Sequence, residues 1–306
     1  MSLSPNRANF STAWAPAKVN LYLHVGSPGT GGLHPVDSMV VFADTRAADR
    51  ISARSAPFLE LSVEGPGAKA LKSAPNNLTL AAALALREAC DRSGLGASMV
   101  LYKELPIAGG VGGGSADAAA TLHVLNEMWG IDFGEAALER LAVQLGADVP
   151  ACVRLRPLVM RGAGEVLADV ACPDLPAVLV NPGIMLETRK VFDKFDRMGA
   201  NRAFHEIDPP WGETPARFAD RLSDYRNDLQ PAAISLCKEI GRALELIEEQ
   251  PGCLLARMSG SGPTCFGLFE DEASAQAAAA AIAEAKKKYW VRATSFRGAA
   301  PVPLDD

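Results

Sequence analysis

The sequence predicts an α+β fold of two domains, and three observations support this. The chain has 306 residues, of which 48% are hydrophobic and 22% charged, so it can bury more than one core. Its expected strands and helices are intermixed, without the steady alternation of a doubly wound sheet. The composition shifts after residues 153–161 toward prolines at 173, 176 and 182. We therefore expect domains at residues 1–160 and 161–306, with the boundary region near 155–175.

The first half of the chain combines short strands with alanine-rich helices. In residues 17–25, one face would carry Val19, Leu21, Leu23 and Val25, and the other Lys18, Asn20, Tyr22 and His24. The expected strands are 17–25, 36–43, 51–53, 59–63 and 98–103, and the expected helices are 78–92, 115–129 and 134–145. Asn76 and Asn77 would cap the first helix, which Gly94 would end, and Gly146 would close the third.

The second half has a similar mixture. The expected strands are 177–181, 253–258, 264–269 and 289–296, and the expected helices are 188–197, 214–224, 229–248 and 271–287. Residues 200–213 show no regular pattern. Ser259-Gly260-Ser261-Gly262-Pro263 lies between two strands, so a tight hairpin is the default interpretation.

Composition and charge exclude several classes of protein. The net charge of −6 argues against a broad nucleic-acid-binding surface. No apolar stretch approaches the roughly 18 residues needed to span a bilayer, and residues 1–7 lack the apolar core of a signal peptide. The six cysteines are scattered without a Cys-x-x-Cys pair. These features predict free thiols in a cytoplasmic protein whose partner is a small molecule, and they leave its oligomeric state open.

The most informative segment is the glycine loop, defined here as residues 106–116. Five of the six residues from Gly109 to Gly114 are glycine, and a helix pattern follows at once. Glycines let backbone amides approach a ligand, and a helix N-terminus adds free N–H groups and partial positive charge. We expect this loop to bind a nucleotide polyphosphate, the alternative being a flexible turn. Ser115-Ala116-Asp117 would supply the helix cap.

The loop fits neither of the two common nucleotide motifs. No Gly-Lys-Ser/Thr follows the glycines, so the lysine of a P-loop is missing. The Gly-x-Gly-x-x-Gly spacing breaks at its last position, and residues 103–108 separate the glycines from the preceding strand.

Lys18 and Asp148 are the candidate catalytic pair. Lys18 shares a strand face with Asn20, although a lone lysine there is usually a surface residue. Asp148 follows a helix end and precedes Pro150, where it could equally cap a helix. If it faces the glycine loop, it could orient or deprotonate a hydroxyl nucleophile, and a nearby lysine would keep it ionised. A lysine, an aspartate and an amide cradle are the components that phosphoryl transfer needs.

Other kinds of catalytic site are not supported. Neither Ser115, Ser259 nor Ser261 satisfies the Gly-x-Ser-x-Gly nucleophile motif. No nucleophilic triad is identifiable around the four histidines, and no metal-ligand spacing appears.

Several separated motifs together resemble those of the GHMP kinases, a superfamily of small-molecule kinases that includes galactokinase, homoserine kinase and mevalonate kinase. The matching segments are 15–21 (APAKVNL), 32–34 (GLH), 112–119 (GGGSADAA), 146–150 (GADVP), 227–229 (NDL) and 259–267 (SGSGPTCFG). They span nearly the whole chain in the expected order. Within the family they are most similar to members whose acceptor is a cytidine-diphosphate-linked methylerythritol of the non-mevalonate isoprenoid pathway.

The resemblance implies a two-domain fold with the active site in the interdomain cleft, and ATP with Mg²⁺ as co-substrate. It implies that Asp148 is the base for the 2-hydroxyl of the acceptor and that Lys18 polarises the same site. A cytidine pocket would map onto Asn20, His34 and Phe192. The Mg²⁺ ligands stay unassigned. The implied phosphate-binding residues are Pro106, Ile107, Ala108, Gly109, Gly110, Val111, Gly112, Gly113, Gly114, Ser115 and Ala116.

The chain departs from the family pattern in two places. Residues 26–33 replace a loop that usually carries arginine, aspartate and tyrosine, with Pro35 after the histidine, and Ala116 replaces a common second serine. Three alternatives therefore stay open: a kinase for a different alcohol, a non-catalytic ligand-binding member of the fold, and a dinucleotide-dependent oxidoreductase. The last would require a strand running straight into the glycines.

Overall fold

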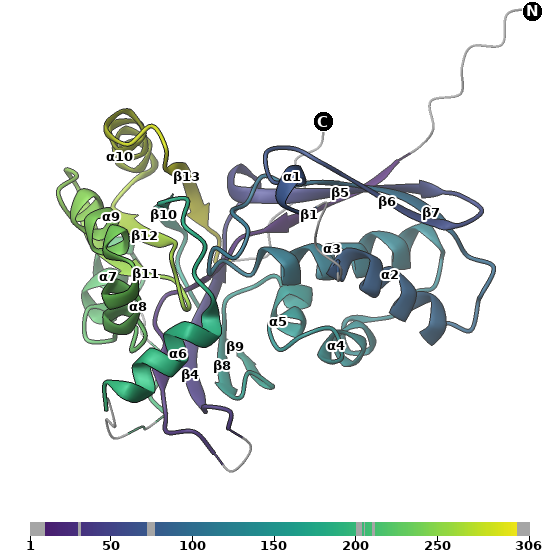
Figure 1. Ribbon diagram of the computed structural model, residues 1–306, viewed down its shortest axis with the longest axis horizontal. Helices are drawn as coiled ribbons and strands as arrows, with labels where there is room; N and C mark the ends of the chain where they lie inside the picture. The colour runs from purple at the N-terminus through teal and green to yellow at the C-terminus, as the bar shows by residue number, and fades with distance from the viewer. Residues whose placement is uncertain are drawn as a thin grey trace, which may run out of the picture.

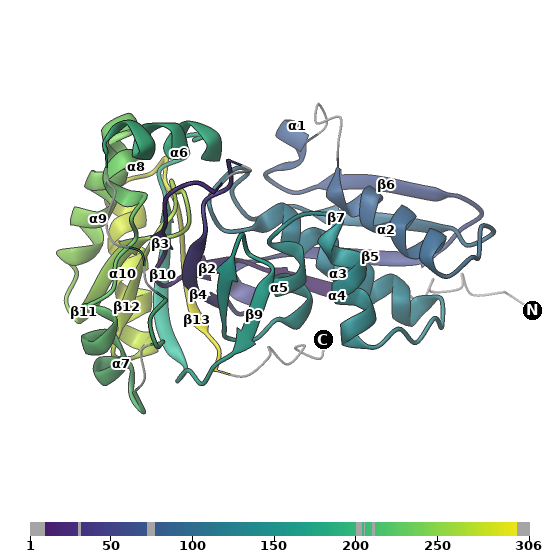
Figure 2. The same ribbon diagram turned by 90° about the horizontal axis from the view of Figure 1, so that it is seen from below.

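The computed structural model describes residues 10–29, 32–71, 77–199, 204, 206–209 and 212–298. Its elements form an elongated molecule with a four-stranded sheet and helices at each end and a five-stranded sheet between them (Figures 1 and 2). None of the described helices is long and apolar enough to cross a membrane.

The sheet at one end is mostly antiparallel, in the order β1-β5-β7-β6. Its strands are β1 (Ser11–Pro16), β5 (Ala48–Ser55), β7 (Ala97–Tyr102) and β6 (Leu59–Glu64), of which β6 and β7 pair in parallel. The helices α1 (Ala68–Leu71) and α2 (Leu78–Ala89) connect that parallel pair. One face of the sheet packs on α2, α3 (Gly113–Met128), α4 (Glu135–Val143) and α5 (Val149–Arg154) around a shared apolar core.

The middle sheet brings together segments from residues 18–42 and 158–169. It contains β2 (Lys18–Asn20), β3 (His24–Val25), β4 (Val36–Phe42), β8 (Leu158–Gly162) and β9 (Val166–Asp169). Both β2 and β3 pair with β4, which also pairs with β8. A short 3-10 helix, η1 (Thr45–Ala47), leads from β4 to β5.

The sheet at the other end is antiparallel, in the order β11-β12-β10-β13. Its strands are β10 (Leu175–Asn181), β11 (Cys253–Met258), β12 (Cys265–Phe269) and β13 (Trp290–Phe296). The helices of this half are α6 (Thr188–Arg197), α7 (Pro215–Leu222), α8 (Gln230–Leu236), α9 (Lys238–Glu248) and α10 (Glu272–Ala285). Apolar residues of α6 and α8–α10 form a second core with this sheet.

A third apolar core joins the middle sheet to this end sheet. Val19 and Val41 from the N-terminal region are buried with Leu179, Phe266 and Phe296 from the C-terminal region. Two isolated bridges, Leu23 to Asn227 and Ala43 to Phe296, also connect these regions. The strands β2 and β4 therefore depend on β10, β12 and β13 for part of their packing.

The α+β class is confirmed, and several expected elements differ in detail. The segment 17–25 forms two short strands instead of one, and its polar face is as buried as its apolar face because β2 and β3 lie between other layers. The helix expected at 229–248 divides into α8 and α9 because Cys237 has an extended backbone. The helix expected at 78–92 ends at Ala89. The strands β1, β8 and β9 and the helix α5 were not expected.

The predicted cap of α3 was wrong. The helix begins at Gly113, before Ser115, and its cap residue is Gly112 in the left-handed conformation with no side-chain cap. In contrast, Asn77 does cap α2, since its side chain accepts a hydrogen bond from the Thr79 amide.

The domain division at 160/161 stays a prediction. Met160 lies inside β8, which pairs with both β4 and β9, so a boundary there would divide a hydrogen-bonded strand. All six cysteines are free, as expected.

Candidate active site

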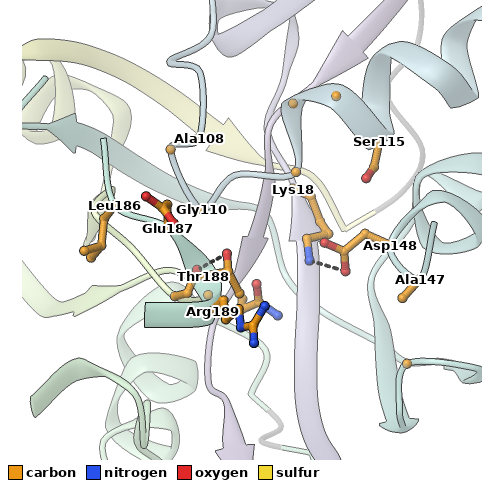
Figure 3. A pocket seen from close by; sticks show the side chains of 18 of the residues that line it. Lys18, Ala108, Gly110, Ser115, Ala147, Asp148, Leu186, Glu187, Thr188 and Arg189 are labelled. Carbon is orange, nitrogen blue, oxygen red and sulfur yellow. Dashed lines mark hydrogen bonds and ion pairs between the residues drawn. The ribbon is translucent and has the colours of Figure 1, made fainter. Parts of the chain in front are cut away.

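A cavity of 1160 Å³ lies where the three sheets approach one another. Its lining comes from β2 and β4, the glycine loop, the first turn of α3, residues 147–148 and 163–164, the start of α6 and the turn at 260–261. Figure 3 shows Lys18, Ser115 and Asp148 on one side of it, with Thr188 and Arg189 on the other. Residues from widely separated parts of the sequence thus line one space.

The cavity gathers most of the residues singled out from the sequence. Those that line it are Lys18, Asn20, His34, Pro106, Ile107, Ala108, Gly109, Gly110, Gly112, Gly113, Gly114, Ser115, Asp148 and Phe192. Val111 and Ala116 do not line it: each is 1% exposed, and their side chains belong to the third and first cores. Thr30 and Gly31 belong to residues 26–33, which differ from the family pattern, and they lie outside the described residues.

The glycine loop is held in place through its backbone. The Lys18 amide donates to the carbonyl of Val111 at 2.9 Å, and the Thr264 amide donates to the carbonyl of Gly109 at 3.1 Å. The Ser259 hydroxyl donates to the carbonyl of Gly110 at 3.0 Å. The turn between β11 and β12 is therefore the expected hairpin and also a support for the glycine loop.

Glycine is required in this loop for close packing as well as conformation. Gly110 has a φ of +74°, and a Cβ there would lie 2.6 Å from the carbonyl oxygen of Gly262. Gly112 has a φ of +61°, and its Cβ would lie 3.1 Å from the Lys18 Cβ. A side chain at either position would push the loop away from its neighbours.

The loop ends at an uncapped helix N-terminus. The amides of the first turn of any α-helix have no acceptor within the helix, and no side chain caps those of α3. These amides and the helix dipole favour an anionic ligand. Because Gly113, Gly114 and Ser115 line the cavity, this positive end of the helix faces the same space as Lys18 and Asp148.

Lys18 and Asp148 form an ion pair inside the cavity, drawn as a dashed line in Figure 3, with Nζ 2.8 Å from Oδ1. The Lys18 side chain is 5% exposed and that of Asp148 39% exposed, so the carboxylate is open to a ligand while the lysine is covered. Asp148 precedes α5 but its side chain does not cap that helix. The capping interpretation was therefore wrong, and so was the interpretation of Lys18 as a surface residue.

His34 and Phe192, which both line the cavity, are in ring contact with each other. Their rings are 5.1 Å apart at an interplanar angle of 42°. His34 Nδ1 is 2.8 Å from the carbonyl oxygen of Gly26, which can only accept, so Nδ1 carries the proton. Nε2 lies 3.4 Å from Oδ2 of Asp196 on α6. The hydrogen bond to the Gly26 carbonyl thus fixes the orientation of the imidazole.

Asn20 occupies the floor of the cavity beside the glycine loop. Its Nδ2 donates to the Ser38 hydroxyl at 2.8 Å, and its backbone amide donates to the Ser259 hydroxyl at 3.1 Å. Asn20, His34 and Phe192 all line the cavity, and Asn20 lies two residues after Lys18 on β2.

A buried charge cluster beneath the glycine loop was missed by the sequence analysis. Lys103 Nζ lies 2.5 Å from Asp49 Oδ2 and 2.6 Å from Asp117 Oδ2. Asp49 also accepts hydrogen bonds from the amides of Glu104 and Leu105. Lys103 and Asp117 line the cavity. The signal available was Lys103 just before the loop and Asp117 just after it, but we had assigned Asp117 to helix capping.

Burial and charge determine the protonation of this cluster. Burial raises the pKa of Asp117 to about 7; Lys103 opposes this effect, and Asp49 adds to it. The pKa of Lys103 is also raised, because the two carboxylates outweigh the effect of burial. With both carboxylates ionised, the cluster around the single Lys103 ammonium carries one net negative charge. A proton on Asp117 makes it neutral.

Arg189 is a further cavity residue that the sequence analysis missed, and no sequence pattern marked it. It lines the cavity from the first turn of α6, next to Thr188, whose hydroxyl is 2.9 Å from that of Ser261. Among the described residues, Lys18 and Lys103 are paired with carboxylates, whereas the guanidinium of Arg189 has no such partner. Arg189 thus lines the cavity, across from the glycine loop, without an ion-pair partner among the described residues (Figure 3).

Comparison with known proteins identifies the family. Residues 77–154 match the family model described as "GHMP kinases N terminal domain", and residues 204–288 match "GHMP kinases C terminal". A protein of Hyphomonas neptunium, named 4-diphosphocytidyl-2-C-methyl-D-erythritol kinase, is 48% identical over 95% of this chain and 97% of its own. The chain belongs to the GHMP kinase family. Like that family, it is an ATP-dependent small-molecule kinase.

Further relatives and solved structures agree with this GHMP kinase assignment. A protein of Cereibacter sphaeroides with the same name is 44% identical over 94% of this chain and 99% of its own. A crystal structure of 4-(cytidine 5'-diphospho)-2C-methyl-D-erythritol kinase superimposes with a TM-score of 0.73 at 30% identity, covering 93% and 99% of the two chains. Homoserine kinase from Cytophaga hutchinsonii gives a TM-score of 0.68 at 17% identity over 97% and 98%, which shows the shared GHMP kinase fold.

This membership excludes the oxidoreductase alternative. In addition, β7 ends at Tyr102, and the six residues 103–108 separate it from the first glycine, Gly109, so no strand runs straight into the glycines.

The packing of the glycine loop predicts different effects for two Gly→Ala changes. Gly110→Ala should weaken ATP binding at least about 10-fold, because the methyl group meets the Gly262 carbonyl and displaces the loop. Gly130→Ala is the matched control: Gly130 has a φ of +58° but nothing within 4 Å of its Cβ position. Isothermal titration with ATP measures both. Equal loss of affinity in the two variants would contradict the assigned role of close packing.

The Lys103 cluster predicts a pH dependence of stability. The folded-state pKa of Asp117, about 7, exceeds its ordinary value of 3.8. Its protonated form therefore stabilises the fold below pH 3.8, and this stabilisation is lost as the pH rises through 7. Asp117→Asn removes the titration and leaves Lys103 paired with Asp49. The stability of this variant relative to the native chain should rise between pH 5 and pH 8 in urea denaturation. A difference independent of pH would contradict the assignment.

Proposed function

We propose that this chain transfers the γ-phosphoryl group of ATP to the 2-hydroxyl of 4-diphosphocytidyl-2-C-methyl-D-erythritol. The observation that carries the proposal is the Lys18–Asp148 pair, which faces the same cavity as the glycine loop and the uncapped start of α3. The relatives at 44% and 48% identity that bear the name of this kinase support the choice of acceptor.

The glycine loop would bind the phosphates of ATP. Its backbone amides and the amides of Gly113, Gly114 and Ser115 can donate to phosphate oxygens, and the dipole of α3 favours their charge. The glycines allow this approach because no side chain separates the amides from the ligand. The γ-phosphate would then lie toward Lys18 and Asp148.

Asp148 would act as the general base. Its exposed carboxylate accepts the proton of the acceptor hydroxyl while that oxygen forms a bond to the γ-phosphorus. The bond between the γ-phosphorus and the bridging oxygen breaks, and ADP leaves with the electron pair. Lys18, 2.8 Å from Asp148, holds the carboxylate in place and stabilises the negative charge that gathers on the transferring group.

Mg²⁺ would accompany the nucleotide, where it neutralises charge on the β- and γ-phosphates. Hydroxyl oxygens are suitable ligands for it, and Ser115 supplies one beside the glycine loop. No group of three or more His, Cys, Asp or Glu side chains that could hold a metal occurs among the described residues. The residues fit an ion that is held mainly by phosphates and water.

The acceptor would occupy the side of the cavity formed by α6 and residues 32–36. The ring of Phe192 offers a stacking surface for a nucleobase, beside the fixed imidazole of His34. Arg189 places its unpaired charge where a diphosphate could lie between the base and the reacting hydroxyl. Asn20 lies nearest to the catalytic pair.

A coupled ADP-release assay tests this function. The native chain should phosphorylate 4-diphosphocytidyl-2-C-methyl-D-erythritol, and Asp148→Asn should lower kcat by about 10²-fold or more, because the general base is lost. The affinity for ATP should stay near normal, since the amide cradle is unchanged.

Mevalonate and homoserine serve as competing acceptors in the same assay. A higher kcat/KM with either of them would overturn the choice of acceptor. Unchanged turnover by Asp148→Asn would show that this residue is not the base.

Arg189→Gln tests the binding of the acceptor diphosphate. Loss of a charge-assisted hydrogen bond to phosphate should raise the KM for the acceptor about 10-fold, with the KM for ATP unchanged. Arg197→Gln is the matched control, because Arg197 lies exposed near the other end of α6 and does not line the cavity. A rise in KM for ATP instead would place Arg189 at the nucleotide.

A further inference from the structure

Two neighbouring strands hold a chain of hydrogen bonds at the floor of the cavity. Asn20 on β2 and Ser38 on β4 both line the cavity, and they are 4% and 1% exposed. The Ser38 hydroxyl lies 2.6 Å from the carbonyl oxygen of Tyr22, and Asn20 Nδ2 lies 2.8 Å from the Ser38 hydroxyl. Ser38 therefore connects the Asn20 side chain to the backbone.

The chemistry of these groups fixes which way the Asn20 amide points. A carbonyl oxygen can only accept, so Ser38 must use its single hydroxyl proton on Tyr22. Toward Asn20, the Ser38 oxygen can then only accept, and it needs the NH₂ group of the amide. The amide oxygen Oδ1 is thereby turned to the other side.

Oδ1 has no hydrogen-bond partner among the described residues. Such a buried acceptor is costly unless a ligand or solvent pairs with it. Its neighbour is Gly260, another cavity residue, where an added Cβ would lie 3.3 Å from Oδ1. The absence of a side chain at Gly260 leaves a donor room to approach.

The backbone of Asn20 is tied to the glycine loop. Its amide donates to the Ser259 hydroxyl at 3.1 Å, and that hydroxyl donates to the carbonyl of Gly110 at 3.0 Å. Oδ1 therefore has a fixed position relative to the loop that would hold the phosphates. Lys18, two residues earlier on β2, is paired with Asp148.

From this geometry we infer that Ser38 is a positioning residue: it holds Asn20 with Oδ1 as the acceptor for an O–H or N–H donor of the bound alcohol. The inference rests on the proposed function, and the donor class is the hydroxyl groups of a polyol. Without Ser38 the amide can rotate and present NH₂, which repels such a donor.

Variants that change only the hydroxyl of Ser38 test this inference. Ser38→Ala should lower kcat/KM for the acceptor roughly 10- to 100-fold, with ATP affinity within about 2-fold of the native value. In the Asn20→Ala background the same change should have an effect of less than about 2-fold, because the group that Ser38 orients is gone. Ser295→Ala, a buried serine of β13 that does not line the cavity, should leave kcat/KM unchanged.

A second pair of variants guards against misfolding of Ser38→Ala. Threonine keeps the hydroxyl and valine replaces it at nearly the same volume, so Ser38→Thr should exceed Ser38→Val in kcat/KM by about 10-fold or more. Equal kinetics of Thr and Val, or the same Ser38→Ala loss with and without Asn20, would overturn the inference.

A measurement without any acceptor separates this inference from the proposed function. In ¹H–¹⁵N spectra of the free protein, the Asn20 side-chain NH₂ signals, identified by their loss in Asn20→Asp, should shift in Ser38→Ala. Unchanged signals would refute the orienting role even if the kinase activity is as proposed. A clear shift, together with no turnover of the cytidine-linked acceptor by the native chain, would refute the proposed function alone.

Discussion

The site depends on one constraint, which is that the glycine loop is held by backbone hydrogen bonds to two distant parts of the chain. Lys18 on β2 binds the carbonyl of Val111, and Thr264, at the start of β12, binds the carbonyl of Gly109. Because the loop residues lack side chains at their closest approaches, these bonds can form at short range. The same contacts bring Lys18 beside the amides of α3 and place Asn20 next to the Ser259 turn. If the loop moved, the proposed phosphate cradle and the proposed acceptor site would separate.

The charges in the cavity serve different purposes according to their surroundings. Asp148 is partly exposed beside a buried lysine, which suits a group that exchanges a proton with a ligand. Asp117 and Asp49 are sealed beneath the loop around Lys103, where they support the backbone of residues 104–105 and the start of α3. Arg189 alone among the described lysines and arginines of the cavity lacks a carboxylate partner, so its charge is available to an anion.

The sequence predicted the fold class and the glycine loop, and most of the predicted site residues line the cavity, because glycines, helix periodicity and strand alternation are local signals. The helix at 188–197 and the strand at 253–258 were predicted at their observed bounds. Tertiary burial could not be predicted: a lone lysine on a strand is usually a surface residue, whereas Lys18 is buried against the glycine loop and Asp148. Asn20 is buried beside Ser38 and Ser259. Asp117 appeared to be a cap because its pairing with Lys103, which Asp49 shares from a distant strand, is a tertiary contact and leaves no local pattern. Arg189 resembles any exposed helical arginine until the cavity is seen.

The long-range pairing of the first strands bears on how the protein is made. The Asn20 amide donates a hydrogen bond to Ser259, 239 positions later in the chain. Asp44 accepts one from the amide of Ser295, 251 positions later. During synthesis the ribosome releases β2 and η1 long before these partners exist. The early strands can pair with β4 and β5, but the faces that the late residues cover must stay exposed or be shielded. The nascent chain can complete the end with α2–α5 early, but the kinase centre closes only once nearly the entire polypeptide has emerged. A chain that terminated before β13 would lack the edge strand of one end sheet and would expose β10. We therefore expect an incompletely folded protein rather than a slower enzyme.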